Sequence, residues 1–143
     1  MALNVYENTT SDPYSTSGLF TLPLILGFDG RTGGVVQKKL YLRNDNVLYK
    51  YEDVTIEVEQ VGGDLDYVGG TEGFYFKMRA GDAQPTAAEW DTISGGNSIS
   101  MSSITDASTY LPFWVYVEVP SHLAVMHIKD VRFKISATES LNP

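Results

Sequence analysis

The stretch PFWVYVEVP, residues 112–120, decides the fold class of this chain. Its apolar residues at every second position alternate with Trp114, Tyr116 and Glu118, and a proline stands at each end. Such a period of two is typical of a β-strand with one buried face. Because strands of a parallel sheet are usually apolar on both faces, burial of a single face indicates an antiparallel sheet.

The same alternation recurs along the chain. Four further stretches place apolar side chains on one face and polar or charged ones on the other: residues 35–43, 54–59, 74–80 and 131–138. Turn-forming residues separate the stretches, at 27–34, 44–46, 62–73 and 94–97. The pattern predicts an all-β fold, an antiparallel β-sandwich. Ig-like and jelly-roll-like topologies both remain open, because strand order is not written in local periodicity.

Two local segments differ from the strand pattern. Residues 85–91 predict one short helical turn, because Thr86 and Glu89 stand at the spacing of a capping box with alanines between them. Residues 1–18 are rich in Ser, Thr, Asn and Asp, and predict an extended N-terminal arm outside a single domain of residues 19–143. The arm has two interpretations: a frayed terminus held loosely, or a segment that becomes ordered against a neighbouring subunit.

Composition narrows the classes of partner. A chain of 143 residues is long enough to bury one hydrophobic core without disulfides or metal ions to stabilise it. The sequence contains no cysteine, and this excludes disulfides, thiolate nucleophiles and cysteine-based zinc sites. The net charge of -8 argues against nucleic acid or an anionic membrane as the main partner. The N-terminus lacks the basic and apolar regions of a signal peptide, so we expect synthesis in the cytoplasm without export.

Candidate catalytic and metal-binding groups are sparse. His122 and His127 could share a metal ion with Asp130, but loop histidines are more often surface residues. A calcium site near Asp64, Asp66 and Glu72 stays open, although their spacing does not match an EF-hand. The chain also lacks a phosphate-binding loop and a Gly-x-Ser-x-Gly elbow. We therefore expect a protein that is not an enzyme and that needs no cofactor.

Aromatic residues give the strongest indication of a binding surface. Nine tyrosines are present, and several aromatic side chains fall on the faces predicted to point outward. Outward aromatics are typical of subunit contacts. The candidate interaction surface comprises Tyr6, Tyr14, Tyr41, Tyr75, Trp90, Trp114 and Tyr116. The alternative is that a loop or the N-terminal arm covers Trp114 and Tyr116.

Three segments together resemble small virion proteins of tailed bacteriophages: LYLRND at 40–45, PTAAEW at 85–90 and PFWVYVEVP at 112–120. That group includes capsid decoration, or cement, proteins and accessory proteins of the tail or baseplate. The resemblance lies in the general character of the sequence across residues 27–138 and not in a defined motif, and it carries over no binding or catalytic residue. It implies a sandwich located in the virion, bound to the major capsid protein or to tail proteins as a homo-oligomer or in many lattice-bound copies.

Three classes of function follow from these observations. The first is a capsid decoration protein, with a tail, baseplate or receptor-binding accessory protein as its alternative. The second is a carbohydrate-binding β-sandwich, in which Trp90, Trp114, Tyr116 and loop tyrosines would stack on sugar rings. The third, an enzyme, ranks last because no constellation of residues supports it.

Overall fold

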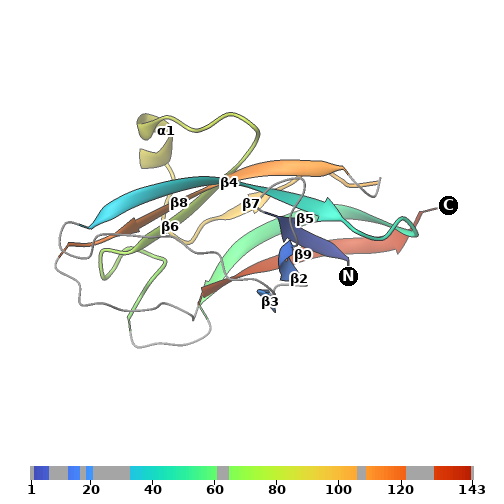
Figure 1. Ribbon diagram of the computed structural model, residues 1–143, viewed down its shortest axis with the longest axis horizontal. Helices are drawn as coiled ribbons and strands as arrows, with labels where there is room; N and C mark the ends of the chain where they lie inside the picture. Colours follow the sequence, from blue (N-terminus) through green and yellow to red (C-terminus); the bar gives the residue numbers. More distant parts are fainter. Residues whose placement is uncertain are drawn as a thin grey trace.

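A computed structural model describes residues 2–6, 13–16, 19–20, 33–60, 65–105, 109–121 and 131–142. These ranges contain nine strands and one short helix (Figure 1). In chain order they are β1 (Leu3–Tyr6), β2 (Pro13–Thr16), β3 (Leu19–Phe20), β4 (Gly34–Asn44), β5 (Tyr49–Gln60), β6 (Tyr75–Ala80), α1 (Ala87–Asp91), β7 (Ser98–Ser100), β8 (Tyr110–Val119) and β9 (Val131–Leu141). No helix among the described residues is long and apolar enough to cross a membrane.

The strands form two antiparallel sheets, which confirms the predicted all-β sandwich. The large sheet has the order β3-β2-β1-β4-β8-β6, and the small sheet has the order β7-β5-β9. Strands that neighbour each other in the two sheets are often far apart in the sequence, as for β4 with β8 and β5 with β9. Figure 1 shows the two layers facing each other, with α1 on the outside of the large sheet.

The core fills the space between the sheets. Phe133 of the small sheet lies edge to face against Phe76 and Phe113 of the large sheet, with ring centroids 5.9 and 6.0 Å apart. The apolar faces predicted from the alternation are the buried ones, including fully buried Leu40, Leu42, Ile56 and Val115. Burial of one large apolar side chain stabilises the fold by about 1.5–3 kcal/mol, so these faces hold the two layers together.

The N-terminal segment belongs to the large sheet. Residues 3–6 are extended, as predicted, but β1 lies between β2 and β4 and places Leu3 and Val5 in the core at 0% exposure. The Ala2 amide donates to Tyr51 Oη at 2.9 Å, and that hydroxyl donates to Glu139 at 2.7 Å. This part of the predicted arm is therefore tied to both sheets instead of being loosely held.

A β-bulge interrupts β5 beside β9. Asp53 and Val54 together face a single residue of β9, and Asp53 adopts a φ of 51°. The extra residue keeps both Tyr51 and Val54 on the buried face, three positions apart. Sequence periodicity places Tyr51 near a strand end, but the structure buries it completely, because the bulge shifts the alternation by one residue.

The outer edge of β6 is covered by two loop segments. Gly96 donates to the Phe76 carbonyl at 2.8 Å, and the side chain of Asn97 bonds both the amide and the carbonyl of Met78. A side chain at Gly95 would stand 2.6 Å from the Val68 carbonyl, so only glycine allows this close approach. These contacts satisfy backbone groups that would otherwise be open to pairing with another chain.

The burial of β1 generates a prediction about stability. Leu3→Ala should lower the free energy of unfolding by about 2–5 kcal/mol, because it leaves a cavity between the sheets. Urea denaturation followed by tryptophan fluorescence measures the change. Val35→Ala, at a side chain that is 46% exposed, is the control and should stay within about 0.5 kcal/mol. Equal effects of the two substitutions would show that β1 is only a frayed end.

The bulge generates a second prediction. Asp53→Gly should raise the free energy of unfolding by roughly 0.5–1 kcal/mol, because glycine adopts positive φ without the steric cost of a Cβ. Glu52→Gly, one residue earlier in ordinary strand conformation, should lower it by about 1 kcal/mol. Thermal denaturation of both variants provides the comparison, and a loss of stability in Asp53→Gly would contradict a strained bulge.

Candidate interaction surface

The outer face of the large sheet carries aromatic side chains flanked by cations. On β8, which lies between β4 and β6, Trp114 is paired with Lys39 of β4 and with Arg79 of β6. Two residues along β8, Tyr116 is paired with Gln37 and Lys77 in the same way. Trp114 is therefore flanked by positive charge on both sides, and Tyr116 on the β6 side, in a chain whose net charge is -8.

The α1 loop, which we define as residues 81–97, covers one half of this face. Trp90 of α1 is only 1% exposed, and its Nε1 donates to Gln37 Oε1 at 2.8 Å. Its ring lies 5.2 Å from that of Tyr116, centroid to centroid, at a tilt of 40°. Trp114 Nε1 donates to the carbonyl of Asp82 in the same loop at 3.0 Å. A loop thus covers Trp114 and Tyr116, which was the alternative considered for their outward position.

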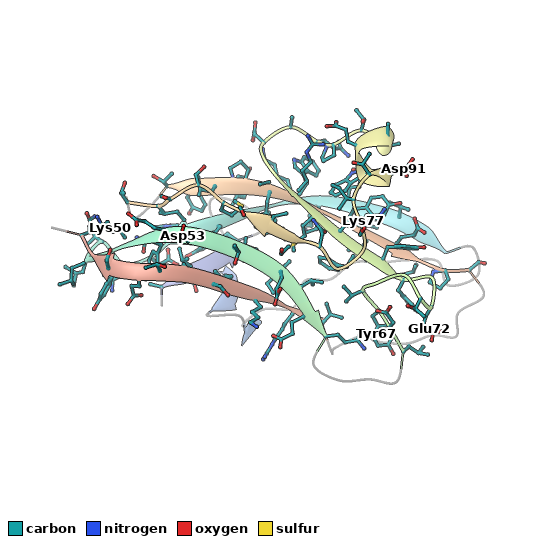
Figure 2. All side chains as sticks on the ribbon, turned by 180° about the vertical axis from the view of Figure 1, so that it is seen from behind. Lys50, Asp53, Tyr67, Glu72, Lys77 and Asp91 are labelled. Carbon is teal, nitrogen blue, oxygen red and sulfur yellow. The ribbon has the colours of Figure 1, made fainter. Side chains whose placement is uncertain are left out.

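The helical turn and its cap are formed as predicted. Thr86 is the N-cap of α1, and it exchanges hydrogen bonds with Glu89 in a complete capping box. The Thr86 backbone amide and then the Arg79 guanidinium lower the pKa of the Glu89 carboxyl. Arg79 pairs with Glu89, and Lys39 pairs with Asp82. Acidic side chains of the α1 loop therefore pair with basic side chains of the large sheet. Figure 2 shows a similar arrangement at Lys77 of β6, with Asp91 of α1 above it.

Tyr116 lies beneath this loop in a protected environment. Its hydroxyl donates to Glu118 at 2.6 Å, and the Lys77 ammonium lies 5.3 Å from the ring centroid. Burial, followed by the hydrogen bond to Glu118, raises the pKa of Tyr116 to about 12. Trp90 contributes to that burial through its ring contact, so the titration of Tyr116 reports whether the loop is in place.

The other half of the face holds a second cluster, centred on Arg43. Its guanidinium carbon lies 5.1 Å from the ring centroid of Tyr110 and 5.8 Å from that of Tyr6, and Nη1 donates to Tyr110 Oη at 2.8 Å. Tyr41 contacts Tyr110 edge to face at 5.9 Å. The Asp45 carboxylate accepts from Tyr6 Oη at 2.5 Å and lies 3.0 Å from Arg43 Nε. We call Tyr6, Tyr41, Arg43, Asp45 and Tyr110 the Arg43 cluster.

The candidate residues fall into three groups. Four are half-buried on the outer face: Tyr41, Tyr75, Trp114 and Tyr116. Tyr6 and Trp90 are buried, at 7% and 1% exposure, so in this state they pack the face and offer little surface to a partner. Tyr14 lies on β2, and its side chain is outside the described residues.

Sequence reasoning did not include Arg43 and Tyr110 in the surface. Local periodicity alone puts Arg43 on the outward face of residues 35–43 and puts Tyr110 near a strand end, and it indicates a binding role for neither. The available signal was the period of two in β8, which continues from Trp114 through Pro112 back to Tyr110. The contact between Arg43 and Tyr110 depends on the pairing of β4 with β8, which local periodicity does not give.

The candidate metal ligands lie only partly within the described residues. Asp64, His122, His127 and Asp130 lie outside the described residues. The Asp66 carboxylate accepts backbone amides of Val68, Gly69 and Thr71, which lower its pKa, with the Gly69 amide as the largest cause. Asp66 therefore organises its own turn. Within the described ranges, no group of three or more His, Cys, Asp or Glu side chains gathers in one place.

Two small cavities lie at the end of the sandwich where β8 begins. The larger has a volume of about 260 Å³ and is lined by Ala80, Gly81, Ser100, Met101, Ser102, Leu111 and Pro112. The smaller, of about 70 Å³, is lined by Ser103, Ile104, Thr105, Thr109 and Leu111. Leu111 lines both cavities, so the two adjoin each other, and we refer to them together as the groove.

Comparison with known proteins gave no match: no protein-family model, curated protein or solved structure is similar to this chain at a significant level.

The covered tyrosine generates a prediction. Because the folded pKa of Tyr116 lies above its ordinary value of 10.0, its contribution to stability is fully present below pH 10 and is lost as the pH rises to about 12. Phenolate absorbance of the wild type should contain a titration step near pH 12 to which both Tyr51 and Tyr116 contribute, and Tyr116→Phe should reduce the amplitude of that step. Trp90→Ala should move the contribution of Tyr116 toward lower pH by uncovering the ring. An unchanged step in Trp90→Ala would contradict the role of the α1 loop as the cover.

Proposed function

We propose that this chain is a non-enzymatic structural protein of a virus particle, and that it binds the capsid lattice in many copies as a decoration protein. The observation that carries the proposal is the contrast between the two outer faces of the sandwich. One face has the composition of a surface that contacts water, and the other has the composition of a protein–protein contact.

The outer face of the small sheet is polar throughout its described rows. Glu59 pairs with Arg132, and Glu57 pairs with Lys134, across β5 and β9. Small hydroxyl residues such as Ser98 and Ser136 occupy neighbouring outward positions. Opposite charges on adjacent strands contribute a few tenths of a kcal/mol to about 1 kcal/mol and keep a sheet face hydrated. This face has the character of an ordinary solvated surface.

The outer face of the large sheet has the composition that protein interfaces prefer. Tyrosine, tryptophan and arginine are the residue types that contribute most to binding energy at such interfaces. The Arg43 cluster retains accessible surface, since the Arg43 side chain is 29% exposed. Its aromatic rings are fixed by edge contacts and hydrogen bonds, so they would lose little conformational entropy when a partner binds. These features support docking through the Arg43 cluster.

The resemblance to small virion proteins supplies the kind of partner. On a lattice, many identical weak contacts act together, so a modest patch on each copy is sufficient for stable decoration. A tail, baseplate or receptor-binding role would use the same surface, and it differs in where the copies bind and in how many do.

A carbohydrate-binding role receives less support from the geometry. Sugar rings stack on an open aromatic face, but Tyr116 is contacted by Trp90 and by Lys77. Trp90 itself is 1% exposed. In the described state, Trp90 and Tyr116 therefore pack against neighbours within the same chain, which leaves little of either ring for a sugar to stack on.

Titration of the purified protein onto capsids and tails of the encoding phage tests the proposal. The number of bound copies should reach a fixed value per capsid. Tyr41→Ala should weaken capsid binding about tenfold, because truncation of an interface aromatic commonly costs more than 1 kcal/mol. Ser136→Ala, on the outer face of the small sheet, is the matched control and should bind as the wild type does.

Other outcomes separate the alternatives. Saturable binding to tails but not to capsids would replace decoration with a tail-associated role. Retention on a glycan array, lost in Trp114→Ala, would favour carbohydrate binding. Capsid binding that is unaffected by Tyr41→Ala would place the docking surface elsewhere on the molecule.

A further inference from the structure

One end of the sandwich presents apolar side chains to solvent. Val47, Leu48 and Leu141 are 66%, 63% and 70% exposed, and we call them the apolar tip. They lie together, because the Asn142 amide donates to the Leu48 carbonyl at 2.9 Å and Leu141 is paired with Tyr49. Figure 1 shows the turn between β4 and β5 at the same end of the molecule as the C-terminus. Scattered apolar residues are normal on a surface, but a contiguous group is typical of a contact site.

The turn that carries the tip is held rigidly. Asn44 is fully buried, and its side chain donates to the Tyr49 carbonyl and accepts from the Asn46 amide, both at 2.9 Å. The Asn46 side chain in turn accepts from the Leu48 amide at 3.0 Å. Side-chain hydrogen bonds of this kind fix the shape of a turn. Val47 and Leu48 are therefore presented in one conformation, which lowers the entropic cost of a contact through them.

A groove lies next to the tip. Asn142, which contacts Leu48 through its amide, also donates from its side chain to the Thr105 carbonyl at 2.8 Å. Thr105 lines the smaller of the two cavities, and Leu111 lines both that cavity and the larger one of about 260 Å³. Met101, Leu111 and Pro112 give the larger cavity an apolar lining. The same end of the molecule thus offers both a protruding apolar turn and a groove of a size that accepts aliphatic side chains.

Charges of both signs stand at the rim of this end, so the rim can complement a second copy of itself. Lys50 follows the turn, and among the described lysines and arginines it is the one for which the structure shows no partner. Each of the others has a contact within the chain: Lys39 with Asp82, Arg43 with Asp45, Lys77 with the Trp90 carbonyl, Arg79 with Glu89, Arg132 with Glu59, Lys134 with Glu57, and Lys38 with a further group. Figure 2 shows Lys50 at this end, with Asp53 farther along β5. Glu52, two residues after Lys50, is exposed. The tip residues themselves carry no charge.

We propose that this end binds the same end of a second copy of the chain, so that two copies associate end to end about a two-fold axis. A two-fold contact requires a surface that is complementary to itself, and here the protruding turn of each copy can enter the groove of the other. The unpaired Lys50 of each copy would face carboxylates of its partner, such as Glu52. Contact through the apolar tips keeps the acidic bodies of the two copies apart, which limits repulsion between chains of net charge -8.

Sedimentation equilibrium of the purified chain over a range of micromolar concentrations tests this proposal. The wild type should show a reversible equilibrium between monomer and dimer. The double substitution Leu48→Ser with Leu141→Ser should weaken dimerisation at least about tenfold, because both side chains lose apolar contact in the interface. Lys50→Glu should weaken it about threefold or more, since it places like charges across the contact.

Val35→Ser is the matched control for loss of exposed apolar surface. Val35 is 46% exposed and lies at the start of β4, where it is paired with Glu118, at the opposite end of that strand from the tip. It should leave the dimer constant within about twofold and, like the tip variants, should leave the circular dichroism spectrum unchanged. A wild type that stays monomeric at every concentration overturns the proposal, and so does a dimer that persists in the double variant.

This experiment is independent of the decoration role. If the wild type stays monomeric and still saturates capsids, the end-to-end dimer is wrong and the proposed function is unaffected. If the wild type dimerises but binds neither capsids nor tails, the end-to-end contact is supported and the proposed virion role is wrong.

Discussion

The contact of Phe133 with Phe76 and Phe113 is the interaction on which the rest of the structure depends. It joins the two sheets through their apolar faces, and it therefore decides which side of every strand is left outside. Successive side chains of a strand point to opposite faces, so fixing the inward position of Phe113 also fixes the outward position of Trp114. The aromatic face of the large sheet is thus a direct consequence of how the core is packed.

The sequence predicts which residues lie on the outer faces wherever apolar and polar residues alternate strictly along a strand. In β8 and β9 the period of two continues without interruption, and it identified the buried residues correctly. In β5 it failed at Tyr51, because the bulge at Asp53 sets buried residues three positions apart. In β1 a strand of four residues among polar neighbours was too short to be recognised, although its Leu3 and Val5 are fully buried.

The candidate surface was predicted in part for a related reason. Periodicity places side chains on a face, but it does not show what lies above that face. Its residue type makes Trp90 a candidate binding residue, but the structure shows that it covers Tyr116. The α1 loop brings Asp82 and Glu89 over Lys39 and Arg79, so positive charge of the sheet is balanced within the chain. Arg43 and Tyr110 meet only because β4 and β8 are neighbours, which is information about topology.

The pairing of β5 with β9 has a consequence for how the chain folds during its synthesis. β9 comes after β5, β6, β7 and β8 in chain order, and it pairs with β5 along nearly its whole length while supplying Phe133 to the core. A ribosome-bound chain that has not yet exposed β9 lacks one face of the sandwich, so the apolar residues of β5 and β8 stay without cover. Folding must then wait for contacts between distant segments, which form slowly because long loops have to close first. Until β9 leaves the ribosome, the nascent protein therefore passes through an interval in which strand edges and apolar faces are open to other chains.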